Sequence, residues 1–330
     1  MSLEKIKKCI KENNSFLISC HISPESDAIG SELALAILLE KLGKKVKVVN
    51  FDPVPNLLSF LPYAKKIIQE KEVTENFDVI CVVDCGEIER TGLFKKDNSG
   101  CTSNGRDISS TIINIDHHIT NTSFGHINWI DPDAVATCEL IYIIAKSFNC
   151  DIDTDMAILL YTGIWEDTGG FRYANTKPDA LRIAAELIEI GVNPSKIAEY
   201  LYEMNSFERL KLLGEILAGM EKSRDGKSAW VVVTQDLFKK TGTTSEDTED
   251  MVNFPRSLKG VEVAMLLREI DPQSWKISFR SRGKVDVAKL AEKFDGGGHR
   301  QAAGCIVKGG MIEAKEKVLK IVEDEINSGS

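Results

Sequence analysis

The stretch SFLISCHISPESDAIGS, residues 15–31, joins a short apolar run to a polar loop and to the start of a helix-like segment. The helix-like pattern continues to Leu42, and the run KVKVVN follows at residues 45–50. Such β-branched residues favour strands. A strand, a helix and a second strand in this order predict the beginning of a layered α/β domain.

Two further apolar runs extend the pattern, DVICVV at residues 78–83 and TIINI at residues 111–115. Continuous runs of Val and Ile indicate strands buried on both faces, as in parallel sheets. We therefore expect a larger N-terminal α/β domain, with a parallel sheet and helices on both faces. Residues 97–110 are polar and rich in turn formers, which predicts a surface loop.

The second half of the chain has a different order of elements. Residues 154–202 are mainly helical, and a further helical pattern at 206–222 ends in a polar turn. Beyond the turn, strand patterns dominate up to a glycine run, which predicts a smaller α+β domain. The predicted division is a domain at 1–222 and a second domain at 223–330.

Charge and composition limit the function. The 330 residues carry a net charge of −9, which argues against a protein that binds long duplex nucleic acid. Residues 256–308 nevertheless hold 11 Lys and Arg against 6 Asp and Glu, which suits a small anionic substrate. No apolar run approaches the roughly 20 residues that span a bilayer. Scattered cysteines without a CxxC pair indicate reduced thiols and a cytoplasmic protein without membrane attachment.

The histidines are the main chemical signal. His21 follows the first strand-like run, and Glu25 and Asp27 come within the next six residues. In open α/β sheets, ligands bind at the carboxyl ends of the strands. Imidazole and carboxylate together suit Mn(II), with Fe, Co or Zn as alternatives. The competing interpretation, equally weighted for this segment alone, is that Asp27 caps the following helix. His126 is expected to be structural.

Three more segments have the same character. Asp84 follows residues 78–83, and Asp116, His117 and His118 follow residues 111–115. Asp167 lies in the glycine-containing segment GIWEDTGGFR, whose last residue, Arg172, is suited to hold a phosphate. Four such segments predict a dinuclear site, in which one carboxylate bridges two metals about 3.5–4 Å apart and a metal-bound hydroxide attacks phosphorus.

A glycine run near the C-terminus predicts an anion-binding loop. Consecutive glycines let backbone N–H groups approach a phosphate closely. Basic side chains at two nearby places in the sequence favour this interpretation over a simple helix-terminating loop. The candidate substrate-binding residues here are Arg280, Ser281, Arg282, Gly296, Gly297, Gly298, His299 and Arg300.

These motifs together resemble the DHH phosphoesterase family, over nearly the whole chain. HISPESDAIGS, VVDCGE, IDHHITN and GIWEDTGGFRYANT are similar to four motifs of its catalytic domain, and GGGHRQAAG to a motif of its DHH-associated domain. The closest likeness is to bacterial nanoRNases that also dephosphorylate 3′-phosphoadenosine-5′-phosphate (pAp). The resemblance implies hydrolysis of short RNA or small nucleotides, two Mn(II) ions with Mg, Co or Fe as alternatives, and a homodimer as a family-level expectation.

The resemblance also implies residue roles. His21, Glu25 and Asp84 would bind the first metal, and Asp27, Asp84, His117 and Asp167 the second. His118 would contact the scissile phosphate, and we count it with Asp116 and Asp84 as catalytic. Arg280, Ser281, Gly298 and His299 would hold the far end of the nucleotide, in a cleft between the domains.

One departure affects the expected metal site. Glu25 stands where the family has aspartate, and Ser26 where it has glycine. The longer side chain predicts lower metal affinity or a changed metal preference. The alternatives within the same chemistry are a RecJ-like single-strand exonuclease and a linear or cyclic dinucleotide phosphodiesterase. A non-catalytic nucleotide or RNA sensor is the alternative of a different class, and Glu25 is the sequence feature in its favour.

Overall fold

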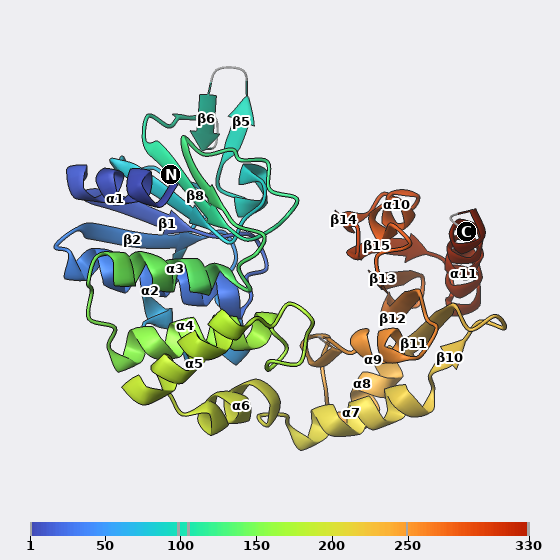
Figure 1. The fold of residues 1–330 in the computed structure, drawn as a ribbon. Helices are drawn as coiled ribbons and strands as arrows, with labels where there is room; N and C mark the ends of the chain where they lie inside the picture. The colour runs from blue at the N-terminus through green and yellow to red at the C-terminus, as the bar shows by residue number, and fades with distance from the viewer. Residues whose placement is uncertain (1, 98–99, 104–105, 249, 329–330) are drawn as a thin grey trace. The chain divides into compact units, whose positions relative to one another are not determined.

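The computed structural model describes residues 2–97, 100–103, 106–248 and 250–328. The chain divides into two compact units, Met1–Met204 and Asn205–Ser330 (Figure 1). This division comes earlier than the expected one at 222/223. The reason is helix α7 (Phe207–Ala218), which buries Leu212 and Ile216 in a core of the second unit. The catalytic and substrate-binding assignments of the two parts remain predictions.

The first unit is built on a six-stranded sheet in the order β3-β2-β1-β4-β8-β9, and every neighbouring pair is parallel. The strand order places β1, β4 and β8 side by side in the middle of the sheet, so their carboxyl ends meet at one edge. The strands are β1 (Ser15–Ser19), β2 (Lys45–Asn50), β3 (Ile67–Gln69), β4 (Val79–Val83), β8 (Thr111–Asp116) and β9 (Ile127–Ile130).

The α-helices cover one face of this sheet, and a short 3-10 helix lies on the other. Helix α2 packs against α3 and α4, and side chains of α1 join the same apolar core. These helices and the two that follow them are α1 (Ser2–Glu12), α2 (Ser26–Lys41), α3 (Thr137–Ser147), α4 (Thr154–Asp167), α5 (Pro178–Ile190) and α6 (Pro194–Tyr202). The opposite face holds a second apolar core that includes Val82, Ile88 and Phe94. Its cover includes the short 3-10 helix η3 (Ile88–Thr91).

The prediction of a surface loop at residues 97–110 is wrong for the part that the structure describes. Strands β5 (Lys95–Asp97), β6 (Gly100–Ser103) and β7 (Arg106–Asp107) form a small antiparallel sheet. Turn-forming residues between short strands gave this segment the composition of a loop. Residues 98, 99, 104 and 105 lie outside the described part.

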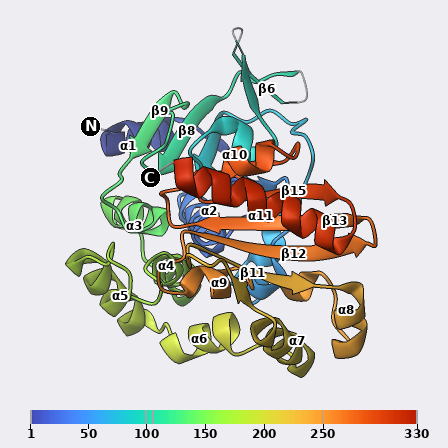
Figure 2. The same cartoon turned by 90° about the vertical axis from the view of Figure 1, so that its right-hand side faces the viewer.

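The second unit contains a mixed sheet in the order β10-β11-β12-β13-β15-β14. Only β11 and β12 pair in parallel; the remaining neighbours are antiparallel. Alternate residues enter two separate cores, with Met265 on one face and Leu266 on the other. Helix α11 (Met311–Ser328) lies across the first of these faces (Figure 2). The strands are β10 (Glu221–Lys222), β11 (Ser228–Val233), β12 (Val263–Asp271), β13 (Ser274–Ser281), β14 (Gly297–His299) and β15 (Ala302–Lys308).

The remaining helices of this unit pack on the two faces of its sheet. Besides α7 and α11 they are α8 (Gln235–Thr241), η4 (Glu246–Thr248), α9 (Asn253–Ser257) and α10 (Val287–Glu292). Helices α7 and α8 contribute to the core that contains Leu266, together with Val252 and Leu258 beside α9. Helices α10 and α11 contribute to the core that contains Met265. The predicted fold class, an α/β domain with a parallel sheet and a smaller α+β domain, is confirmed. Within the described ranges, none of the helices has the length and apolar character required to cross a bilayer.

Candidate metal centre

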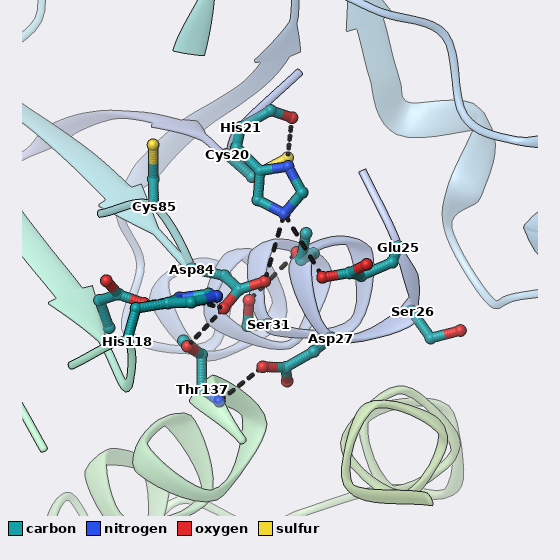
Figure 3. Close-up of polar contacts among 12 residues, drawn as sticks. Cys20, His21, Glu25, Ser26, Asp27, Ser31, Asp84, Cys85, His118 and Thr137 are labelled. Carbon is teal, nitrogen blue, oxygen red and sulfur yellow. Dashed lines mark hydrogen bonds and ion pairs between the residues drawn. The ribbon is translucent and has the colours of Figure 1, made fainter. Parts of the chain in front are cut away.

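The carboxyl edge of the first sheet gathers the predicted histidines and acids (Figure 3). His21 lies two residues after β1, Asp84 directly follows β4, and Asp116 ends β8. Since these three strands are neighbours, their ends bring the side chains into one site. The site is completed by α2, which carries Asp27, and by Asp167 at the end of α4.

Asp27 is fixed by the beginning of another helix. Its two carboxylate oxygens accept hydrogen bonds from the backbone N–H groups of Thr137, at 2.6 Å, and Cys138, at 2.8 Å. These are the first residues of α3, where unpaired N–H groups and the helix dipole favour a negative charge. The residue at the cap of α2 is Glu25, and it makes no side-chain capping bond. Asp27 therefore does not cap its own helix.

Asp84 lies at the centre of the site. It is 1% exposed and has a positive φ of 51°, which is uncommon for a residue other than glycine. Its Oδ1 accepts a hydrogen bond of 3.0 Å from the Thr137 hydroxyl and is 3.6 Å from His117 Nε2. Its Oδ2 is buried without a hydrogen-bond partner among the described residues and is 3.5 Å from His21 Nε2.

The ring of His21 is oriented by the backbone. Its Nδ1 is 2.8 Å from the Ile22 carbonyl oxygen, which accepts the Nδ1 proton and leaves Nε2 facing Asp84 and Glu25. Burial lowers the pKa of His21, but the Asp84 carboxylate outweighs burial and raises it to about 9. Although the side chain of Glu25 is half-exposed, desolvation at its carboxylate and the charge of Asp84 raise its pKa to about 7.

His117 joins the other acids. Its Nε2 is 3.2 Å from Asp167 Oδ2 and 3.9 Å from Asp27 Oδ2, while Nδ1 lies 3.4 Å from the Ala134 carbonyl oxygen. Burial opposes the charge on His117, but Asp167 and the neighbouring carboxylates raise its pKa to about 10. Burial, Asp84 and Asp167 together raise the pKa of Asp27 well above its ordinary value.

Asp116 stands behind the site. Its Oδ1 accepts hydrogen bonds from the His117 backbone N–H, at 2.8 Å, and from His118 Nδ1, at 2.7 Å. Its Oδ2 accepts a hydrogen bond from the Asn121 amide at 2.5 Å. Through these bonds Asp116 orients His118, and it belongs to none of the metal-ligand clusters found among the described residues. The hydrogen bond that His118 Nδ1 donates to Asp116 is also the main cause of the raised pKa of His118.

Among the described residues, three clusters of ligand atoms are close enough together to hold a metal ion. They are Asp84 with His117 and His118, His21 with Glu25 and Asp84, and Asp27 with His117 and Asp167. Asp84 and His117 each belong to two clusters, as residues shared between neighbouring ions would. A divalent cation fits the donor set, because it would partner the buried Asp84 Oδ2 and counter the mutual repulsion of the carboxylates.

Sequence reasoning missed three residues that shape this site. Thr137 bonds both Asp27 and Asp84, and Glu166 accepts a hydrogen bond of 3.0 Å from the Ser26 backbone N–H. Gly163 permits close helix packing, because a Cβ there would lie 2.8 Å from Asp27 Oδ1. Thr137 carries no sequence signal, whereas Glu166 and Gly163 lie within the motif GIWEDTGGFR that contains Asp167. His126 is structural, since its Nδ1 accepts the Ile112 backbone N–H at 2.9 Å.

The predicted phosphate-binding arginines differ in their surroundings. Arg172 is exposed after α4, with its Nε 2.6 Å from the Gly169 carbonyl oxygen. Arg282 donates to three carbonyl groups at residues 256–258, where α9 ends, so it has a structural role. Arg300 is exposed near the Gly283 carbonyl oxygen. Arg280 lines a cavity of the second unit.

The remaining predicted residues lie around β14. Gly296 and Gly298 have packing reasons to be glycine, because a Cβ at either would lie about 2.5 Å from atoms of β15. Gly297 pairs with Gly304 and has open space beside it. Ser281 is buried at the end of β13. The backbone of His299 lies in β14, and its side chain falls outside the described part.

Imidazoles and carboxylates at the carboxyl edge of an open parallel sheet define a class of hydrolases that use divalent metals. The chain belongs to the DHH family of phosphoesterases. Residues 15–164 match the model of the DHH family, N-terminal domain, and residues 231–328 match that of the DHHA1 domain.

Two similar proteins cover nearly the whole chain. The bifunctional oligoribonuclease and PAP phosphatase NrnA of Thermus thermophilus is 34% identical over 310 residues, which is 94% of this chain and 89% of that protein. The crystal structure of an exopolyphosphatase-related protein from Bacteroides fragilis is 30% identical, with a TM-score of 0.84. That match covers 98% of this chain and 96% of the other.

A more distant solved structure shows the fold alone. Exonuclease RecJ bound to manganese is 13% identical, with a TM-score of 0.52, and the match covers 98% of this chain and 92% of the other. At this identity, the likeness does not extend to substrate or to individual side chains.

Proposed function

We propose that this protein is a metal-dependent phosphoesterase that degrades short oligoribonucleotides to mononucleotides and dephosphorylates pAp. The observation that carries the proposal is the set of three ligand clusters linked through Asp84 and His117. The substrate class follows from the Thermus thermophilus relative, whose name gives oligoribonuclease and PAP phosphatase activities.

The metal set is two divalent ions, with Mn(II) as the first choice and Mg, Co or Fe as alternatives. His21, Glu25 and Asp84 would hold one ion, and Asp27, His117 and Asp167 the other, with Asp84 shared between them. Bound there, the ions supply Lewis-acid stabilisation of phosphoryl oxygens and lower the pKa of water.

The protein's own contribution is orientation and charge. Asp116 holds the Nδ1 proton of His118 and directs Nε2 away from that bond. His118 is the most exposed of the three site histidines, at 34% against 4% for His21 and 17% for His117. A raised pKa keeps its proton available, so Nε2 would donate to an oxygen of the scissile phosphate as negative charge develops.

The second unit would bind the part of the substrate remote from the scissile bond. Arg280, Ser281, the backbone at Gly297 and Gly298, and His299 are the proposed contacts, with Arg172 and Arg300 as further phosphate contacts. Arg282 is a weaker choice because its guanidinium bonds the end of α9. A homodimer and a cytoplasmic location remain predictions from the sequence.

The experiment is a comparison of three substrates with Mn(II): pAp, a dinucleotide RNA and a long single strand. Hydrolysis of the first two, abolished by chelation, is the expected result. Degradation of the long strand alone would replace the proposal with a RecJ-like nuclease. Binding of nucleotides without turnover would indicate a sensor, and cleavage of linear dinucleotides without pAp hydrolysis would indicate a dinucleotide phosphodiesterase.

A further inference from the structure

The second unit contains a cavity of about 390 Å³ on one face of its sheet. This volume is within the range of small-ligand sites. Alternate residues of the central strands form its floor: Leu266 and Arg268 on β12, and Lys276, Ser278 and Arg280 on β13. Arg280 is already expected to bind substrate from the family resemblance, whereas Arg268 and Lys276 have no assigned role.

The strand register puts two of these positive charges together. Arg268 is the direct cross-strand partner of Lys276, and Leu266 pairs with Ser278 on the same face. Like charges directly opposite each other destabilise a sheet. A positive pair at this position therefore opposes folding stability unless something else balances it.

Nothing in the described part of the chain balances these charges by a direct ion pair. Within those residues, no carboxylate oxygen lies within 4.0 Å of a nitrogen of Arg268, Lys276 or Arg280, although these residues line one cavity. Both arginines are partly buried, and burial lowers their pKa values. Partly desolvated arginines without a carboxylate in direct contact indicate a site that is completed by an anion from outside, although the charge of Asp250 acts on Arg280 at longer range.

The cavity also carries acidic groups. Glu246 and Asp250 line it together with Ser245 and Thr248. These groups accept hydrogen bonds and repel a ligand that is anionic throughout. A nucleotide suits both kinds of charged group, since its phosphate is anionic and its ribose and base carry hydroxyl or amino donors. Inorganic polyphosphate would pair with the cations but would offer no hydrogen-bond donor to the acidic groups.

We propose that Arg268 and Lys276 extend the Arg280 site into a pocket for a second, non-scissile phosphate of a nucleotide substrate. The proposal rests on the proposed function. The feature of the substrate that the pocket selects is a phosphate remote from the bond that is cut. Both pAp and 5′-phosphorylated short RNA have this feature.

The test uses the full-length protein with EDTA, so that binding is measured without hydrolysis. Arg268→Gln and Lys276→Gln are each expected to weaken binding of pAp by about 10-fold, since each removes a charge-assisted contact. Binding of 3′-AMP, which lacks the second phosphate, should change by less than about 2-fold. Lys259→Gln, at an exposed position outside the cavity, is the matched control and should bind pAp as the wild type does.

Thermal unfolding separates loss of binding from loss of fold. Neither pocket variant should lower Tm, because each relieves the repulsion between Arg268 and Lys276. Equal pAp affinity in the wild type and both variants would overturn the proposal. Competition by tripolyphosphate as effective as that by pAp would overturn the nucleotide assignment.

A second assay keeps this proposal distinct from the proposed function. With Mn(II), both pocket variants should hydrolyse bis(p-nitrophenyl) phosphate at the wild-type rate, since this ester has no second phosphate. If the wild type hydrolyses neither this ester nor pAp, the proposed function fails. The binding difference between pAp and 3′-AMP would still decide whether the pocket exists.

Discussion

The two units hold their charges in opposite ways. In the first unit, Asp27 and Asp116 are buried and each accepts hydrogen bonds from two or more donors. In the second unit, Arg268, Lys276 and Arg280 line an open cavity without an ion-pair partner among the described residues. Groups that hold metal and perform chemistry need fixed positions. Groups that capture a ligand need unsatisfied charge. Changes in the first unit should therefore reduce kcat, and changes in the second should raise KM.

The largest expected effect is at Asp84. Asp84→Asn removes the negative charge shared by two ligand clusters while retaining the hydrogen bond from Thr137. We expect kcat for pAp to fall by about 10³-fold or more, with a loss of bound Mn(II) and no loss of fold. Asp236→Asn, on the exposed surface of α8, is the control. Activity within 10-fold of the wild type would break the assignment of the site.

The second-largest effect is expected at Asp116, which orients the His118 ring without binding metal. Asp116→Asn removes the carboxylate that accepts the Nδ1 proton of His118. We expect a fall in kcat of about 10- to 100-fold, with unchanged Mn(II) stoichiometry. Steady-state kinetics and metal analysis of the purified variant provide the measurement. Loss of one metal ion would make Asp116 a ligand and contradict its position behind the site.

In the second unit, a substitution at Arg280 is expected to change KM more than kcat. Arg280→Gln removes a cation from the cavity of the second unit, and Arg280 belongs to none of the metal-ligand clusters of the described residues. KM for pAp should rise by about 10-fold, with kcat within about 3-fold of the wild type. A fall in kcat as large as that of Asp116→Asn would show that the units do not divide chemistry and binding in this way.

A smaller effect is expected at Glu25. Its carboxylate is half-exposed and 3.8 Å from His21 Nε2. Glu25→Asp shortens the side chain by one methylene, which moves the oxygens within the cluster. We expect a change of a few-fold in Mn(II) affinity, measured by titration calorimetry. Equal activity and metal occupancy would remove the reason to connect Glu25 with lowered affinity or a different metal preference.

The smallest effect concerns stability. Glu32 on α2 is fully buried. The side-chain amide of Asn50, on β2, donates a hydrogen bond of 2.8 Å to Glu32 Oε2, and Glu32 Oε1 has no hydrogen-bond partner in the described part of the chain. Burial raises its pKa from 4.5 to about 8. Between these values, the unfolded chain loses a proton that the folded chain keeps, so the wild type loses stability as the pH rises.

Glu32→Gln removes this penalty. In EDTA, the variant should unfold several degrees higher than the wild type at pH 9, with a much smaller difference at pH 5. The exposed Glu189→Gln is the matched control and should show no such pH dependence. An equal Tm difference at both pH values would contradict the ionisation of buried Glu32.

The sequence predicted the main elements because their patterns are local. The apolar runs at 15–20, 78–83 and 111–115 became neighbouring strands, and their polar successors met at one edge. The small sheet at 95–107 was missed because its short strands lie among turn-forming residues. The division into two compact units falls before α7 and not after it, because a helix pattern does not state which core the helix joins.

The sequence by itself determined the parallel sheet, the type of ligands and the order of the motifs, all of which depend on residue type and spacing. Only the tertiary structure decided that α3 begins where Thr137 and Cys138 hold Asp27, and that Asp116 supports His118 from behind. It also decided that Arg268 and Lys276 share a cavity, through the register of two strands. These contacts join residues distant in sequence, and their geometry arises from packing that no local pattern encodes.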